Sequence, residues 1–64
     1  MVTGESRCVC GWKHPCITAY DEQGLRREAG EKHQAARHDN CQELPDVYLL
    51  SEQGKKPIGK AIVS

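Results

Sequence analysis

Cys8 and Cys10 stand one residue apart near the start of the chain, and a run rich in His and Cys follows at residues 33–41. The two thiols would lie on the same side of a strand, and Gly11 lets the backbone turn so that its amides can hydrogen-bond the thiolates. A helix end that carries His and Cys can supply the other ligands of a tetrahedral ion, so the pattern predicts one structural zinc site. The simpler interpretation is two half-buried cysteines in a strand, because Cys is often a small buried residue.

The ligands on the helix side are His33 and one further residue. His33 is expected to point inward from the helix. His38 follows at a spacing found in the histidine pairs of zinc fingers, but on an ideal helix it lies about 140° around from His33. Cys41 lies beyond the expected helix end and can reach back toward the site. The sequence therefore leaves the fourth place open between His38 and Cys41.

Three neighbouring residues have simpler expected roles. Cys16 is expected to be a buried or semi-exposed free thiol, because its use as a ligand would need a third donor from the short loop after Cys10. His14 is expected to be a solvated loop histidine. Trp12 is expected to cover the site and add to the core, since the chain has few other large side chains.

Four cysteines in 64 residues could instead form a disulfide scaffold, or remain inert or redox-active thiols. Disulfides need an oxidising compartment, and residues 1–7 lack the apolar segment of a signal peptide, so a cytoplasmic, metal-binding chain is predicted. No apolar stretch approaches membrane-spanning length, so no transmembrane segment is expected.

Composition limits both the core and the function. A chain this short is expected to be one domain, residues 1–64, whose core needs a staple such as a metal, because only 38% of its residues are hydrophobic and none is Phe. The net charge is zero, which removes the simplest argument for nucleic-acid binding. The sequence has no Gly-rich phosphate loop and no Ser/His/Asp arrangement, so an enzyme is not expected.

The expected fold is a small α+β domain stapled by zinc. Residues 7–18 suit a β-hairpin that turns at the Cys-x-Cys knuckle, with Val9, Trp12 and Ile17 directed inward. Within it, residues 13–16 look like a loop, and Pro15 restricts the strand to an edge or a bulge. Residues 1–6 have no pattern and are expected to be frayed or weakly paired.

One helix is expected from Glu22 to Arg37, with Asp21 as its N-cap. Its inward sector, at 100° per residue, consists of Leu25, Ala29, His33 and Ala36.

A C-terminal hairpin is expected in residues 46–64, with strands at 47–51 and 58–63 and a turn at 52–55. Either it stands apart and offers its apolar side chains as a docking surface, or it folds back to enlarge the core. The side chains in question are Val47, Leu49, Ile58 and Ile62.

The segment from Cys8 to Trp12, followed by an Ala-containing helix and the cluster at 33–41, resembles the small CxCGW zinc-finger-like proteins of actinobacteria and especially of their bacteriophages. The resemblance covers residues 7–41, and the 46–64 hairpin has no counterpart in it. It implies an accessory intracellular protein that acts on a host component.

Two functions compete at this level, and the oligomeric state is left open. The first is a zinc-stabilised binding module that contacts another protein, favoured by the neutral charge and the lack of catalytic motifs. The second is a regulatory nucleic-acid-binding zinc finger, although acidic residues are interspersed among its basic ones. The basic residues in question are Arg26, Arg27, Arg37, Lys55, Lys56 and Lys60.

Overall fold

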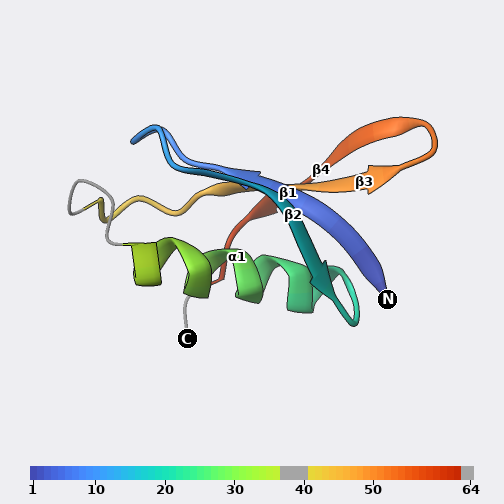
Figure 1. Cartoon of the computed structure of the whole chain (residues 1–64), viewed down its shortest axis with the longest axis horizontal. Helices are drawn as coiled ribbons and strands as arrows, with labels where there is room; N and C mark the ends of the chain where they lie inside the picture. Colours follow the sequence, from blue (N-terminus) through green and yellow to red (C-terminus); the bar gives the residue numbers. More distant parts are fainter. Residues whose placement is uncertain (37–40, 63–64) are drawn as a thin grey trace.

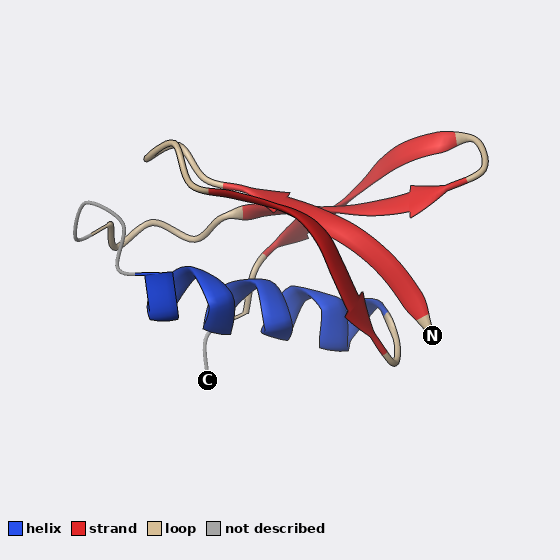
Figure 2. Cartoon of the chain, in the orientation of Figure 1, coloured by secondary structure: helices blue, strands red, loops and turns tan. Residues whose placement is uncertain are grey.

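The computed structural model describes residues 1–36 and 41–62, which form a four-stranded antiparallel sheet with one helix packed across one face (Figures 1 and 2). The strand order is β2-β1-β3-β4. The elements in chain order are β1 (Val2–Arg7), β2 (Lys13–Ala19), α1 (Glu22–Ala36), β3 (Asp46–Ser51) and β4 (Gly54–Lys60). The predicted α+β domain of two hairpins and a helix is confirmed.

Strand β1 lies inside the sheet, so the prediction that residues 1–6 are frayed is wrong. It pairs with β2 from Val2↔Ala19 onward and with β3 on its other side, which satisfies its backbone groups in both directions. The alternation of buried and exposed positions along β1 was hard to recognise from the sequence, because the buried positions carry Gly4 and Ser6 rather than large apolar residues. A Cβ at Gly4 would collide with the Tyr48 carbonyl oxygen and with Leu25, so the helix packs closely at this point.

Residues 13–16 were expected to form a loop, and that prediction is also wrong, because Lys13–Ala19 is a strand. The pairing jumps from Gly4↔Ile17 to Ser6↔His14, so Pro15 and Cys16 together face one residue of β1 in a bulge. The expected restriction of Pro15 to an edge or bulge is confirmed, since β2 is an edge strand and a bulge absorbs the proline.

Helix α1 begins after Asp21, whose Oδ1 accepts a hydrogen bond from the Gly24 amide at 2.7 Å, as expected of an N-cap. Leu25, Ala29 and His33 are buried, which confirms most of the predicted inward sector. Ala36 is exposed instead, because the strands end before the last turn of the helix (Figure 2). The predicted helix end at residue 37 lies outside the described residues.

The C-terminal hairpin folds back onto the rest of the chain. Strand β3 pairs with β1 from Gly4↔Leu49 to Arg7↔Asp46, so both hairpins share one sheet. Strand β4 starts at Gly54, earlier than predicted, because a two-residue turn lets Ser51 pair directly with Gly54. Gly54 has a φ of 113°, which favours glycine at this turn.

The core lies between the sheet and α1 and draws on every part of the chain. Its fully buried apolar residues are Ile17, Leu25, Ala29, Val47 and Ala61, with Val2, Ala19, Leu49 and Ile58 packed against them. The chain after β4 is held to the helix, since the Arg26 carbonyl accepts from the Ile62 amide at 3.0 Å. Arg26 Nε also donates to the Lys60 carbonyl at 2.8 Å. Within residues 1–36 and 41–62, no helix has the length and apolar character needed to cross a membrane.

Candidate metal centre

Four potential ligands from three separate segments meet at one end of the molecule. The ligand atoms of Cys8, Cys10, His33 and Cys41 all lie within 4.8 Å of one another. The Sγ atoms of Cys8 and Cys41 are 3.5 Å apart, and Cys10 Sγ is 3.5 Å from His33 Nε2. These residues are therefore positioned to bind a metal ion.

The knuckle that carries Cys8 and Cys10 is a hydrogen-bonded turn. The Cys8 amide donates to the Trp12 carbonyl at 2.8 Å, and the Gly11 amide donates to the Cys8 carbonyl at 3.0 Å. Gly11 has a φ of 98°, a conformation that residues with a Cβ rarely adopt. Val9 was expected to point inward, but it is 81% exposed because it occupies the outer tip of this turn. The turn thus directs the two cysteines inward while Val9 faces out.

His33 is placed by the packing of α1. It is the buried residue nearest the end of the helix, with 5% of its surface exposed. The Trp12 ring meets its imidazole edge to face, with ring centres 5.0 Å apart. Trp12 therefore covers the site, as the sequence predicts.

Cys41 arrives from the segment between α1 and β3. This segment is anchored four residues further on, where the buried Pro45 accepts a hydrogen bond from the Ala61 amide at 2.8 Å. The structure thus brings Cys41, one of the two candidates for the fourth place, into the cluster. His38, the other candidate, lies outside the described residues.

The donor set fits a zinc ion in both geometry and charge. Tetrahedral zinc with Zn–S bonds of about 2.3 Å and a Zn–N bond of about 2.0 Å has ligand–ligand separations of about 3.5–3.8 Å. Two of the ligand–ligand separations, both 3.5 Å, match this range, and all of them are within 4.8 Å. Three thiolates and one imidazole are also donors that zinc prefers.

The crowded sulfurs also show why a cation suits the site. A backbone hydrogen bond at Glu43 lowers the pKa of Cys41, but burial and the adjacent Cys8 and Cys10 sulfurs outweigh it and raise that pKa to about 11. Burial raises the pKa of Cys8. Hydrogen bonds from the Cys10 backbone and from Cys41 lower it by more in total, so the net shift of this pKa is downward. A bound cation would favour loss of the proton from the thiol whose pKa is raised.

Cys16 and His14 do not belong to this cluster. Cys16 is a free thiol on β2, as the sequence predicts, but it is exposed rather than buried or semi-exposed. His14 was expected in a solvated loop, but it lies in β2 and is half-buried beside Trp12, with ring centres 6.2 Å apart. The structure therefore assigns it to the packing around the knuckle.

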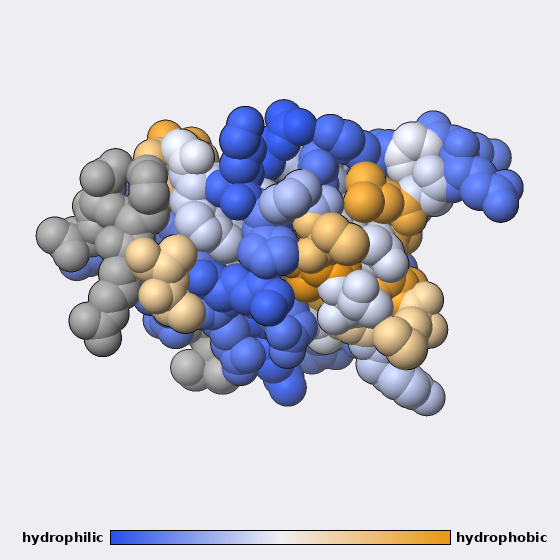
Figure 3. Space-filling view, in the orientation of Figure 1, coloured by the Kyte–Doolittle hydropathy of each residue, from blue (hydrophilic) through white to orange (hydrophobic). Residues whose placement is uncertain are grey.

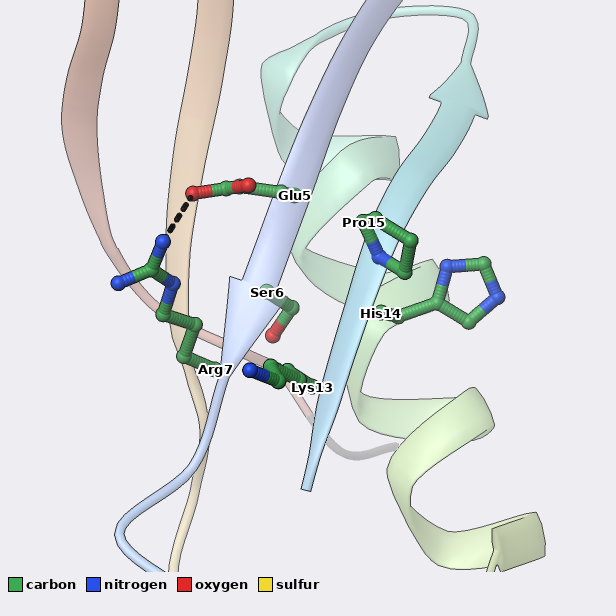
Figure 4. A pocket seen from close by; sticks show the side chains of 6 residues that line it. All are labelled: Glu5, Ser6, Arg7, Lys13, His14 and Pro15. Carbon is green, nitrogen blue, oxygen red and sulfur yellow. Dashed lines mark ion pairs between the residues drawn. The ribbon is translucent and has the colours of Figure 1, made fainter. Parts of the chain in front are cut away.

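Apart from the metal-ligand cluster, the surface has a hollow of about 270 Å³ whose lining includes a Ser, a His and a Glu, the residue types of a catalytic triad (Figure 4). These three side chains are not joined by hydrogen bonds of the kind that a triad needs. Ser6 Oγ donates to the Asp46 carbonyl at 2.9 Å, and the Glu5 carboxylate pairs with Lys55 at 2.8 Å and Arg7 at 3.5 Å. Glu5 and His14 point to opposite sides of their strands (Figure 4). These groups therefore do not form a catalytic triad in this arrangement.

Substitution at the two candidates for the fourth ligand should have unequal effects. Cys41→Ser is expected to weaken metal affinity at least 100-fold, because it removes a thiolate that already faces Cys8. His38→Ala is expected to change affinity by less than about threefold, because the four ligands are then intact. Competition with a chromogenic chelator measures both, and cadmium-113 NMR of the substituted protein should report three sulfur ligands. A larger loss for His38→Ala would place the fourth ligand at His38.

Comparison with protein-family models, with curated proteins and with solved structures finds no match to this chain, so its resemblance to the CxCGW proteins stays a prediction from the residues quoted above.

Proposed function

We propose that the chain is a small binding module held together by one structural zinc ion and that it contacts another protein. The convergence of Cys8, Cys10, His33 and Cys41 from three segments supports the metal. Four protein ligands close the coordination shell and leave no position for water or substrate, which is typical of structural rather than catalytic zinc. The closed shell therefore supports a structural rather than a catalytic role for the proposed zinc.

The proposed contact surface is the end of the molecule that carries the metal ligands. Val9 is 81% exposed between two ligands, and Leu44 is 41% exposed three residues after Cys41. The knuckle and the segment from residue 41 to 45 lie at this same end (Figure 1). The rest of the face drawn in Figure 3 is mixed, with separate hydrophobic areas set among hydrophilic side chains. A metal that fixes both segments would present these two apolar side chains in a constant arrangement.

The resemblance to phage and actinobacterial proteins makes a host protein in the cytoplasm the partner we propose. The C-terminal hairpin is not proposed as the contact surface, because its apolar residues are used in the core. Val47 is fully buried, and Leu49 and Ile58 pack against the core.

Substituting the two exposed apolar residues tests this proposal. Val9→Glu and Leu44→Glu are each expected to reduce capture of a host protein about tenfold, because they place a charge in the contact. Tyr20→Glu is the matched control, since Tyr20 is 86% exposed but follows β2 at the opposite end. All variants should retain the metal, and captured proteins are quantified by mass spectrometry with and without nuclease. Equal capture by all three variants would contradict the proposed surface.

The second candidate, nucleic-acid binding, is favoured by the charge of the sheet. The four strands carry five basic residues against two acidic ones, Glu5 and Asp46. Several of the predicted contact residues are already engaged within the protein, however. Lys60 pairs with Asp46 at 2.8 Å, and Arg26 donates to a backbone carbonyl. Nuclease-sensitive capture, with duplex affinity that falls steeply with salt, would favour this candidate over a protein partner.

A further inference from the structure

Two cysteines in the proposed metal site are arranged so that they could form a bond with each other. The Sγ atoms of Cys8 and Cys41 are 3.5 Å apart although the residues are 33 positions apart in sequence. Cys41 is half-buried, so a small oxidant in solution can reach its sulfur. A disulfide needs an S–S distance of about 2.05 Å, so the two sulfurs, which lie on separate segments, would have to move about 1.5 Å closer.

The other thiol of the site is less suited to pairing. The Cys10 sulfur faces His33 Nε2 at 3.5 Å. A bond between Cys8 and Cys10 would have to close within the knuckle, which is already fixed by hydrogen bonds from Cys8 to Trp12 and from Gly11 to Cys8. Deforming that turn would break these contacts, whereas a bond from Cys8 to Cys41 leaves them intact.

We propose that Cys8 and Cys41 form a peroxide-sensitive thiol pair whose disulfide replaces the metal as the staple of the fold. The part of this proposal that concerns metal release rests on the proposed zinc site. Formation of the disulfide rests only on the arrangement of the two sulfurs.

The reaction balances with hydrogen peroxide as the two-electron oxidant. One thiolate of the pair attacks a peroxide oxygen and becomes a sulfenic acid as the O–O bond breaks, and the hydroxide that leaves takes up a proton to form water. The second thiolate attacks the sulfur of the sulfenic acid, the S–S bond forms, and another hydroxide leaves and is protonated to water. Overall, two thiolates, one hydrogen peroxide and two protons give one disulfide and two waters.

As a consequence, the disulfide takes over from the metal as the cross-link within the fold. The zinc ion loses two of its four ligands and is released, while Cys10 and His33 become free. The knuckle remains tied to the segment before β3, because the disulfide joins two of the three segments that the metal would join, and only the link to α1 through His33 is lost. The oxidised chain should therefore keep its fold without metal.

The test uses the full chain with Cys16→Ser, which removes the exposed thiol that could link two molecules. Purified, zinc-loaded protein is titrated with hydrogen peroxide while a chromogenic indicator follows zinc. After free thiols are alkylated, trypsin is expected to yield residues 8–13 linked to residues 38–55, with the alkyl group on Cys10. One zinc should appear per linked peptide, the circular dichroism spectrum should persist, and reductant with zinc should reverse both changes.

Several results would overturn the proposal. They are a disulfide within residues 8–13, conversion of the cysteines to sulfinic acids with no link, and loss of the circular dichroism spectrum on oxidation. Cys10→Ser should still form the link and Cys41→Ser should not, and the peptide map of the parent protein decides the question if either variant fails to fold. Folded protein that is purified without metal would contradict the zinc site alone, because the link can still be mapped in that folded, reduced chain.

Discussion

Chelation of the metal is expected to unfold the whole sheet rather than the knuckle alone. The four ligands tie the turn between β1 and β2 to α1 and to the segment that leads into β3, so every hairpin depends on the site. Structural zinc contributes about 10–16 kcal/mol of apparent binding free energy in small domains, comparable to or greater than the roughly 5–15 kcal/mol net stability of an ordinary domain. Among the described residues the buried core cluster has five members, two of them alanines, which is too few to compensate for that loss.

Elemental analysis should find one zinc per chain, and chelator should abolish both the circular dichroism spectrum and the dispersion of amide signals in NMR. Cys8→Ser and His33→Ala should have the same effect as the chelator, because each removes a ligand. Cys16→Ser is the matched control, since this exposed thiol lies outside the cluster and its loss should leave the melting temperature unchanged. A folded, reduced protein that contains no metal would contradict the site.

Removal of residues 46–64 is expected to prevent folding rather than to leave an intact zinc module. The deletion takes away β3, whose pairing with β1 satisfies one side of the central strand, together with Val47 and Ala61 of the core. It also removes the Ala61 amide that holds Pro45, and so loosens the segment that carries Cys41. We expect no cooperative thermal transition, and metal affinity at least 100-fold below that of the full chain.

A single substitution in β3 measures how much side-chain packing contributes to stability when no part of the chain is removed. Val47→Ala is expected to lower the free energy of unfolding by about 1–3 kcal/mol, because Val47 is completely buried and its neighbours cannot fill the space. Tyr20→Ala, at an exposed position, should change it by less than about 0.5 kcal/mol. Denaturant unfolding measures both. If the deleted chain retained one zinc and its helix, the hairpin would be an independent appendage.

The helix and its buried face could be predicted because they depend on local sequence. Asp21 has the side chain of an N-cap, and Leu25, Ala29 and His33 repeat at helical spacing. The knuckle was equally readable, since two cysteines followed by Gly11 define its turn. These features need no knowledge of distant parts of the chain.

The features that were missed depend on tertiary contacts. Strand β1 escaped prediction because its core positions carry Gly4 and Ser6, and Gly4 is required only because Leu25 and Tyr48 approach it. The choice of fourth ligand was open because the position of Cys41 depends on how the segment before β3 is anchored. Val9 was misplaced because alternation along a strand does not continue through a turn.

The central position of β1 also determines the order in which the chain can fold. Its first partner, β2, follows after a short turn, so the knuckle hairpin can form early from local contacts. Its second partner, β3, comes after the helix, and bringing Gly4 to Leu49 requires closure of a long loop. During synthesis, one side of β1 must therefore stay unpaired until the last third of the chain has been made. Over that interval the unpaired backbone of β1 can pair with another chain.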